Sequence, residues 1–349
     1  MAATQALRVA VVGAGAFGRN HLRVLRELQQ VGQTVELVAV VDRDSAAVAL
    51  ASEKFGVPGF ETIEECLTAV GGLDAASVCV PTVHHASVAA RLLAAGVDLL
   101  IEKPLAASLA DADLILELAR KHGRIVQVGH LERFNPAVSA ARQHLHKPMF
   151  FEAHRLSIFT PRSLDVDVVL DLMIHDLDIV LSLVASPVRE VRAVGLPVLS
   201  RKVDIANVRV EFENGCIANF TASRVSTERV RKLRFFQPHQ YLSLDFARQD
   251  LLMIDVTAAA GMDPAMLAAL AEKAQQAGAH PSAGLSLKKV TVEQGEPLRL
   301  EIESFLQAVR ERTRPVVSGE DGRAALALAL EINDAIAVHA DRAGLRDFM

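Results

Sequence analysis

The sequence has no tryptophan and one tyrosine, and this scarcity of large flat side chains narrows the functions it can have. Its 14 phenylalanines bring the aromatic share to only 4%. Proteins that hold single-stranded nucleic acid stack its bases on aromatic side chains, so we expect no such surface here. The net charge of -5 also argues against a general surface for nucleic acid or anionic membranes. Local basic patches can still bind an anionic small molecule.

Cysteine is also scarce, and long apolar runs are missing. Cys66, Cys79 and Cys216 are scattered, odd in number and without C-x-x-C spacing, which predicts a reducing compartment and no structural disulfides. Cys79 falls in a predicted buried strand, where a cysteine is usually a small hydrophobic residue. No apolar run approaches the roughly 18 residues of a membrane span, and residues 1–6 lack a signal-peptide pattern. We therefore expect a cytoplasmic protein.

The chain has 349 residues, of which 51% are hydrophobic, and this is enough for two domains with full cores. In the first part, short apolar runs alternate with helical segments. The expected strands are 7–12, 35–41, 75–80, 97–101 and 125–128, and the expected helices are 17–30, 45–55, 85–95 and 108–122. This alternation predicts a doubly wound parallel α/β sheet, and we assign it to residues 1–128.

The pattern changes after about Pro136, and we assign residues 129–349 to a second domain. After an expected strand and a long helix, several strand-like runs follow without helices between them, and Asn214-Gly215 is a strong hairpin signal. The expected strands are 150–158, 188–198, 205–212, 216–224, 232–236, 241–246 and 251–256, and the expected helices are 166–184, 297–312 and 319–340. A largely antiparallel sheet follows from this order. Residues 258–283 fit either a helix with frayed ends or an insert.

A glycine-rich turn joins the first strand to the first helix. Gly13 permits a tight turn, Gly15 lets the backbone approach a pyrophosphate, and Gly18 allows close packing between helix and strand. Ala16 and Phe17 open the helix, whose N-terminus favours a negative charge. In this strand–turn–helix context the pattern predicts dinucleotide binding.

Asp42 ends the second strand and indicates which dinucleotide is bound. A carboxylate there can accept hydrogen bonds from the adenosine ribose diol and repels a 2′-phosphate. This favours NAD, although Arg43 beside it weakens the exclusion of NADP. The alternative is a carboxylate that caps the next helix or lies in a loop.

The next two strands also end in polar residues, at the edge where ligands of open parallel sheets bind. Pro81, Thr82 and His85 follow the third expected strand, and Thr82 and His85 fit contacts to the nicotinamide ribose. A helix start with exposed imidazoles explains them equally well. Glu102 and Lys103 follow the fourth, where a lysine near the cofactor's positive ring can hydrogen-bond a reacting hydroxyl. The alternative is a surface Glu–Lys pair before a turn proline.

Asp171 and His175 lie four residues apart in an expected helix and therefore share a face. A carboxylate beside an imidazole is a common general-base arrangement. A metal site is a weaker alternative, because no further ligand set is clear, and we assign no metal. A polar stripe exposed to solvent is the simplest alternative, and without further context we favour it.

Two groups of basic residues lie in the second domain. Arg224, Arg229, Arg231, Lys232 and Arg234 form a cluster that fits an exposed sheet edge or, less simply, a rim that contacts an anion. The second group lies just before the helix with Asp171 and is better placed to meet a substrate: His154, Arg155 and Arg162.

Taken in order, these motifs resemble the Gfo/Idh/MocA oxidoreductase family. The resemblance rests on Gly13-x-Gly-x-x-Gly18, Pro81-Thr-x-x-His85, Glu102-Lys103-Pro104, Asp171-x-x-x-His175 and residues 315–322. It implies a Rossmann domain, a second domain built on a large open, mostly antiparallel sheet, and NAD(P)-dependent chemistry on sugars or cyclitols. Lys103, Asp171 and His175 match the catalytic positions, with His175 as proton acceptor. Thr82 departs from the family's frequent Asn, and members usually form homodimers or homotetramers.

Three segments are similar to the branch of this family that acts on UDP-N-acetylglucosamine: residues 128–136, which contain His130 and Arg133, residues 171–178 and residues 231–237. This narrower resemblance implies oxidation of the sugar's 3-hydroxyl with NAD. An aminotransferase would then use the ketone in lipid A synthesis. The alternatives are another sugar or cyclitol dehydrogenase, an NAD-dependent glycosidase and an NAD-binding regulator without turnover.

Overall fold

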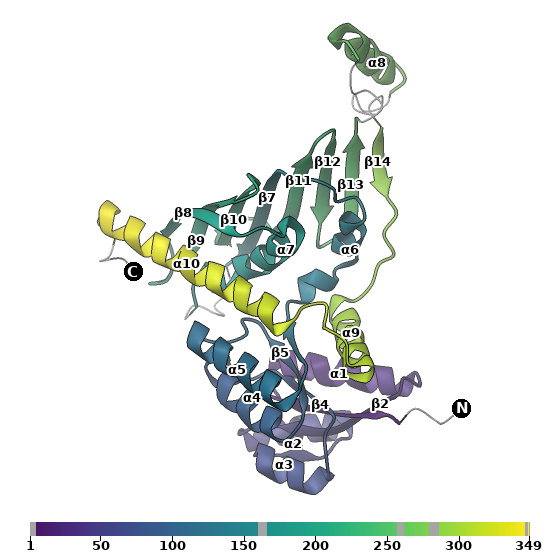
Figure 1. Ribbon diagram of the computed structural model, residues 1–349, viewed down its shortest axis with the longest axis vertical. Coiled ribbons are helices and arrows are strands. Elements are labelled where there is room, and N and C mark those ends of the chain that lie inside the picture. The colour runs from purple at the N-terminus through teal and green to yellow at the C-terminus, as the bar shows by residue number, and fades with distance from the viewer. Residues whose placement is uncertain (1–4, 160–165, 257–261, 279–285, 346–347, 349) are drawn as a thin grey trace. The chain divides into compact units, whose positions relative to one another are not determined.

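The computed structural model describes residues 5–159, 166–256, 262–278, 286–345 and 348, and these form two compact units (Figure 1). The first unit comprises Met1–Phe134 and Glu296–Ala327, and the second comprises Asn135–Gly295 and Leu328–Met349. The chain therefore returns to its first unit late in the sequence. The sequence analysis expects one domain boundary, after residue 128. Such a boundary does not account for Glu296–Ala327, which belong to the first unit.

The first unit is built on a six-stranded parallel sheet with the order β3-β2-β1-β4-β5-β6. Its strands are β1 (Leu7–Val12), β2 (Val35–Val41), β3 (Gly59–Phe60), β4 (Ala75–Val78), β5 (Asp98–Glu102) and β6 (Val126–Gly129). From β1 the chain adds β2 and then β3 on one side of the sheet. It then returns to the other side of β1 and adds β4, β5 and β6. This reversal creates a crevice between β1 and β4 at the carboxyl edge of the sheet, where doubly wound folds bind ligands.

Helices cover both faces of this sheet, because right-handed crossovers change face where the strand order reverses. The helices are α1 (Ala16–Gln30), α2 (Ser45–Phe55), α3 (Ile63–Val70), α4 (His85–Ala94), α5 (Leu109–His122) and α9 (Pro297–Glu311). Helix α1 packs against α2 and α9, and α4 packs against α5. Apolar side chains of α9 join the core formed by β1, β2 and α1, which explains why α9 belongs to the first unit.

Local capping fixes where several helices begin. Ser108 accepts a hydrogen bond from the backbone N–H of Asp111 at the start of α5, and Gly123 ends that helix in a left-handed conformation. Ser318 and Asp321 form a reciprocal cap at the start of α10 (Gly319–Ala343). In both caps an aspartate follows the serine three residues later, which is the spacing of a capping box.

The second unit is built on an eight-stranded sheet with the order β14-β13-β12-β11-β7-β10-β9-β8. Its strands are β7 (Phe150–Ile158), β8 (Val188–Leu196), β9 (Ile205–Phe212), β10 (Ile217–Ser226), β11 (Val230–Gln237), β12 (Gln240–Asp245), β13 (Asp250–Asp255) and β14 (Leu287–Val290). Every pair is antiparallel except β7 with β10. The predicted parallel and mostly antiparallel sheets are therefore both confirmed.

Helices cover one face of this second sheet. Helix α6 (Pro136–Arg142) contacts β12 and β13, α7 (Ile174–Val184) follows a π-helical turn that contacts β10, and Ile336 of α10 lies against Gly195 of β8. On the covered face the rings of Phe151 and Phe235 lie 5.3 Å apart, and both are fully buried. The core of the unit lies between these helices and the sheet.

A buried ion pair lies in the same core. The guanidinium of Arg155 donates two hydrogen bonds of 2.8 Å to the carboxylate of Asp176, and both side chains are 3% exposed. The guanidinium also lies 5.5 Å from the centre of the Phe246 ring. The pair joins β7 to α7 by two parallel charge-assisted hydrogen bonds, the strongest geometry for this pairing.

Several elements differ from the sequence expectation. The long helix expected over residues 166–184 begins instead with a π-helical turn, Val169–Met173, in which the N–H of Ile174 bonds the carbonyl of Val169 five residues earlier. The short β3, α3, α6 and β14 are not among the elements expected from the sequence, while α8 (Pro264–Gln276) lies within residues 258–283, for which the sequence fits either a helix or an insert. None of the described helices is long and apolar enough to cross a membrane.

Asp176→Ala is expected to lower the free energy of unfolding by about 3–5 kcal/mol, because it removes the carboxylate that accepts both hydrogen bonds from a buried guanidinium. Urea titration of the full-length protein measures this change. The matched control is the double variant Arg155→Met with Asp176→Leu, which removes both charges and should cost far less. A single variant no less stable than the double variant would contradict this account of the pair.

Candidate active site

A cavity of about 850 Å³ lies in the first unit at the carboxyl ends of β1, β2 and β4. The predicted residues in its wall are Gly13, Gly15, Ala16, Phe17, Asp42, Arg43 and Pro81. Residues that the sequence analysis missed complete the wall, among them Asp44, Glu61, Thr62, Ile63, His84, Ser87, Val88 and Arg91. Its position at the reversal of strand order is the one that doubly wound folds use for dinucleotides.

The glycine-rich turn shapes one side of this cavity. Gly13 has a φ of 105°, and a Cβ there would lie 2.6 Å from the backbone of Cys79. A Cβ at Gly18 would lie 1.7 Å from the carbonyl oxygen of Gly13. Gly15 differs, because a Cβ there has no described heavy atom within 4 Å, and no side chain caps the helix at this residue. The first backbone N–H groups of α1 are thus left for an anion such as a pyrophosphate.

Asp42 connects the end of β2 to the glycine-rich turn. Its carboxylate accepts a hydrogen bond from the N–H of Ala14 at 2.6 Å and another from the N–H of Asp44 at 3.0 Å. Each carboxylate oxygen has a second lone pair, so these bonds leave room for a ribose hydroxyl. Asp42, Asp44 and Glu61 all line this part of the cavity and oppose a 2′-phosphate, whereas Arg43 and Arg91 would attract one.

The two histidines after β4 have different environments. His84 lines the cavity, but His85 is 1% exposed and outside the wall. The ring of His85 lies within hydrogen-bond distance of three carbonyl oxygens, those of Val80, Pro104 and Leu105. Burial lowers the pKa of His85, although these carbonyls act in the opposite direction. An exposed imidazole, one of the two alternatives, does not describe His85. Its ring instead connects the segments that follow β4 and β5.

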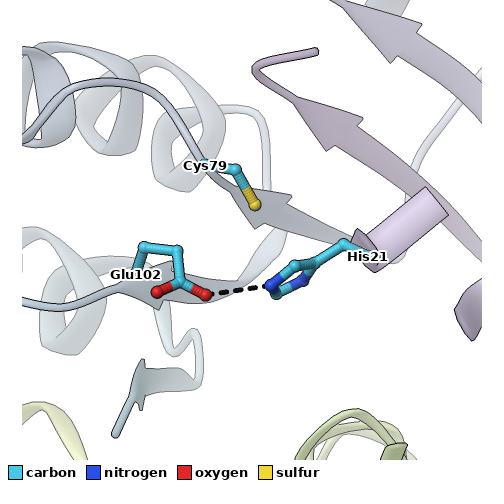
Figure 2. Close-up of side chains that lie close together, drawn as sticks. All are labelled: His21, Cys79 and Glu102. Carbon is cyan, nitrogen blue, oxygen red and sulfur yellow. Dashed lines mark hydrogen bonds and ion pairs between the residues drawn. The ribbon is translucent and has the colours of Figure 1, made fainter. Parts of the chain in front are cut away.

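Three polar side chains of the first unit lie close together, those of His21, Cys79 and Glu102 (Figure 2), and Cys79 also lines the cavity. The Nε2 atom of His21 on α1 lies 2.9 Å from a carboxylate oxygen of Glu102 at the end of β5. The Sγ atom of Cys79 and the facing atoms of His21 and Glu102 all lie within 4.8 Å of one another. Burial raises the pKa of Cys79 well above its ordinary value, and the charges of Glu102 and Glu301 add to this effect.

Three such atoms are compatible in type with a zinc site, yet the geometry favours a hydrogen-bonded pair. His21 and Glu102 already face each other at hydrogen-bond distance, and structural zinc sites almost always have four protein ligands. Cys79 is half-buried and forms part of the cavity wall. It is therefore more than the small hydrophobic residue expected from the sequence.

The other predicted site residues of the first unit lie near the ends of β4, β5 and β6. Thr82 and Lys103 are half-buried and outside the cavity wall. His130 and Arg133 follow β6 and are buried, with exposed fractions of 1% and 8%. Their proposed contacts to cofactor and substrate stay predictions.

The predicted base and its partner belong to the second unit. Asp171 lies in the π-helical turn and His175 near the start of α7, and both are half-buried. Because this segment begins with a π-helical turn and not a regular α-helix, the spacing of four residues does not by itself put Asp171 and His175 on one face. π-Helical turns occur frequently at functional sites, which gives the segment a different kind of support.

The basic residues of the second unit divide by burial. His154 and Arg155 are neighbours on β7 and therefore point to opposite faces of the sheet, and only Arg155 faces the covered side, where it is buried with Asp176. Arg224 is also buried and lies 3.8 Å from Asp204, which contradicts its place on an exposed edge. Arg229, Arg231 and Lys232 are exposed, while Arg162 lies outside the described residues.

Comparisons with known proteins agree with this geometry. A family model described as an oxidoreductase family with an NAD-binding Rossmann fold matches residues 7–130, and a model of the GFO/IDH/MocA C-terminal domain matches residues 137–237. The chain belongs to the GFO/IDH/MocA oxidoreductase family. The family resemblance, the fold class and the NAD-binding Rossmann domain are thereby confirmed.

Individual members of the GFO/IDH/MocA family are similar over different shares of the chain. UDP-N-acetylglucosamine 3-dehydrogenase of Acidithiobacillus ferrooxidans is 33% identical over 332 residues, which are 95% of this chain and 97% of that enzyme. A solved structure of that enzyme matches with a TM-score of 0.83 at 31% identity, covering 95% of this chain and 98% of the other. Inositol 2-dehydrogenase of Acidothermus cellulolyticus is 32% identical over 205 residues, 56% of this chain and 58% of that enzyme.

Gly15→Ala and Gly18→Ala are expected to separate cofactor binding from folding. Gly18→Ala places a methyl group against the carbonyl of Gly13 and should lower the free energy of unfolding by about 2 kcal/mol or more. Gly15→Ala meets no such obstacle, so stability should change by less than about 0.5 kcal/mol while NAD affinity falls. Urea titration and calorimetric titration with NAD measure the two effects. Equal loss of stability in both variants would contradict the assigned roles.

Asp42→Asn is expected to lower the preference for NAD over NADP by about tenfold, because it removes the charge that opposes a 2′-phosphate. Calorimetric titration with each oxidised cofactor gives the ratio of dissociation constants. Asp44→Asn is the matched control, since it removes the same charge from the same wall and asparagine still caps α2. A larger shift in the Asp44 variant than in the Asp42 variant would place the adenosine ribose elsewhere.

Proposed function

We propose that this protein oxidises the 3-hydroxyl of UDP-N-acetylglucosamine to the corresponding 3-keto sugar with NAD. The observation that carries the proposal is the similarity to the enzyme of that name, at 33% identity over 95% of this chain and 97% of that enzyme. Segments of both compact units support it, namely residues 128–136, 171–178 and 231–237, which carry the narrower resemblance. The cavity in the first unit supports the cofactor assignment.

Three residues would perform the chemistry in this proposal. His175 removes the proton of the reacting hydroxyl, Asp171 orients the imidazole and stabilises its charged form, and Lys103 hydrogen-bonds the reacting oxygen. NAD, when bound, supplies the hydride acceptor. Lys103 follows β5 in the first unit, whereas Asp171 and His175 belong to the second.

The cofactor would lie along the cavity, and the residues at each end indicate which part of the cofactor they contact. The adenosine ribose would face Asp42, the pyrophosphate would face Gly15 and the N-terminus of α1, and the nicotinamide would face the segment after β4. The half-exposed position of Asp42 and the open space at Gly15 support this direction.

The nucleotide diphosphate of the substrate needs positive or hydrogen-bonding groups. We propose His130, Arg133, His154 and Arg162 for this role. Arg155, which the sequence groups with His154 and Arg162, has a buried guanidinium bonded to Asp176, so we assign it to stability instead.

We also propose a cytoplasmic homodimer or homotetramer that supplies a 3-keto sugar to an aminotransferase of lipid A synthesis. Reduced, unpaired cysteines are usual in the cytoplasm, and Cys66, Cys79 and Cys216 are all free. The uncovered face of the second sheet carries an aromatic group, with ring centres of Phe150 and Phe236 5.6 Å apart and Phe236 37% exposed. An apolar group on an open sheet suits a surface between subunits.

A second candidate is a cyclitol or free-sugar dehydrogenase. The similarity of inositol 2-dehydrogenase to part of the chain favours this candidate. The family's two domains are compatible with it as well, because a fold does not by itself specify the substrate. The same assay discriminates between the candidates, because only the substrate offered to the enzyme changes.

Pure protein is expected to form NADH from NAD and UDP-N-acetylglucosamine when a carbonyl trap removes the ketone. Lys103→Ala and His175→Ala should each lower kcat by about 100-fold or more, the usual size of a general acid–base contribution. Absorbance at the NADH wavelength measures the rate, and calorimetry measures NAD affinity.

The two variants carry their own control, since neither should change the NAD dissociation constant more than about twofold if the residues act on the substrate. Turnover with myo-inositol or a free sugar, and none with the nucleotide sugar, would select the second candidate. Full turnover in His175→Ala would remove that residue as the base.

A further inference from the structure

The pair formed by His21 and Glu102 has chemistry that hydride transfer itself does not require. His21 is completely buried on α1, and the side chain of Glu102 is 11% exposed. The carboxylate is held at 2.9 Å by Nε2 of the imidazole and lies close against Gly129, where a Cβ would be 3.0 Å from its carboxyl carbon. The carboxyl group is thus fixed in place by α1 on one side and β6 on the other.

The net charge of this pair follows from the second nitrogen of the ring. The Nδ1 atom of His21 is buried and has no hydrogen-bond partner among the described residues. An imidazolium would carry a proton there, and a buried cationic N–H without a partner is costly. The neutral ring with its proton on Nε2 donates to Glu102 and leaves Nδ1 bare. The pair therefore carries one negative charge.

This charge lies one side chain behind the cavity wall. Cys79 lines the cavity, and its sulfur lies within 4.8 Å of the facing atoms of both His21 and Glu102 (Figure 2). The charge of Glu102 acts on this sulfur, since it helps to raise the pKa of the thiol. Cys79 follows β4, the strand whose end faces the nicotinamide half of the cofactor in the proposed orientation.

We propose that the buried carboxylate of Glu102, held by His21 behind Cys79, makes the site bind the oxidised cofactor in preference to the reduced one. The inference rests on the proposed orientation of the cofactor, and it does not depend on which sugar is oxidised. The nicotinamide ring is cationic in NAD⁺ and neutral in NADH, so a nearby negative charge stabilises only the oxidised form.

The preference has a consequence for turnover in the direction of alcohol oxidation. Once the hydride has arrived, the ring no longer interacts with the carboxylate by charge, and NADH leaves more readily for the next NAD⁺. Product release limits the rate of many enzymes. A unit charge about 12 Å away at an effective dielectric constant of about 20 changes an equilibrium about tenfold, which is the size of effect we expect.

Glu102→Gln tests the proposal, because glutamine keeps the length of the side chain and an oxygen that accepts from His21 while it removes the charge. Calorimetric titration of the full-length protein with NAD⁺, and fluorescence titration with NADH, give both dissociation constants without any sugar present. The dissociation constant for NAD⁺ should rise about tenfold, and that for NADH should change less than about twofold. An equal change in both constants, or no change in either, overturns the proposal.

Glu61→Gln is the matched control, since Glu61 lines the same cavity near β3 on the adenosine side. It removes the same charge and should change both dissociation constants by the same factor. A shift of the NAD⁺/NADH ratio in this variant instead of in Glu102→Gln would mean that the nicotinamide lies at the other end of the cavity, and would overturn the proposal.

A second variant protects the test against misfolding. His21→Leu combined with Glu102→Met replaces both partners by apolar groups, which is often tolerated when removal of one partner is not. It should show the same roughly tenfold change in the NAD⁺/NADH ratio. Because no sugar is present, failure of this test leaves the substrate assignment untouched, and failure of the sugar assay leaves this result untouched.

Discussion

The close approach of three backbone segments is the constraint on which the cofactor site depends. Gly13 lies against the backbone of Cys79, and Gly18 lies against the carbonyl of Gly13, at distances that admit no Cβ. These contacts bring β1, α1 and the end of β4 together at the point where the strand order reverses. Of these three glycines, only Gly15 has open space at its Cβ position, and it lines the cavity.

Other features of the first unit follow from this approach. With α1 held so near β4, His21 can reach Glu102 at the end of β5, and Cys79, whose sulfur lies within 4.8 Å of both, lines the cavity. Asp42 reinforces the turn by accepting the N–H of Ala14. The residues that bind the cofactor and those that set the charge behind it are therefore fixed by one local packing arrangement.

The sequence predicted those features that depend on residues close together in the chain. The glycine-rich turn and the serine-to-aspartate spacing at the starts of α5 and α10 are local patterns, and the structure contains both. Short elements escaped notice because two to eight residues give little periodicity; the Thr62-x-x-Glu65 capping box was the available signal for α3.

Features that depend on distant partners were not predictable in the same way. Arg155 can be buried because Asp176 pairs with it, and His85 can be buried because its ring faces the carbonyls of Pro104 and Leu105. Helix α9 belongs to the first unit because it packs into the core around α1. The π-helical turn is a further case, because its composition is that of an ordinary apolar helix. Of the candidate site, the glycine-rich turn and Asp42 were predicted together with their place, whereas the pairing of His21 with Glu102 appeared only in the structure.

Two of the buried pairs differ in net charge, and this difference separates a stabilising pair from a functional one. Arg155 and Asp176 cancel each other's charge through two hydrogen bonds and lie within the packed core of the second unit. His21 and Glu102 share one hydrogen bond and retain a negative charge, and a buried net charge opposes folding. A purely structural contact between α1 and β5 would be met better by apolar side chains. The position of this uncompensated charge directly behind the cavity is thus better explained by an interaction with a cationic ligand than by the stability of the sheet.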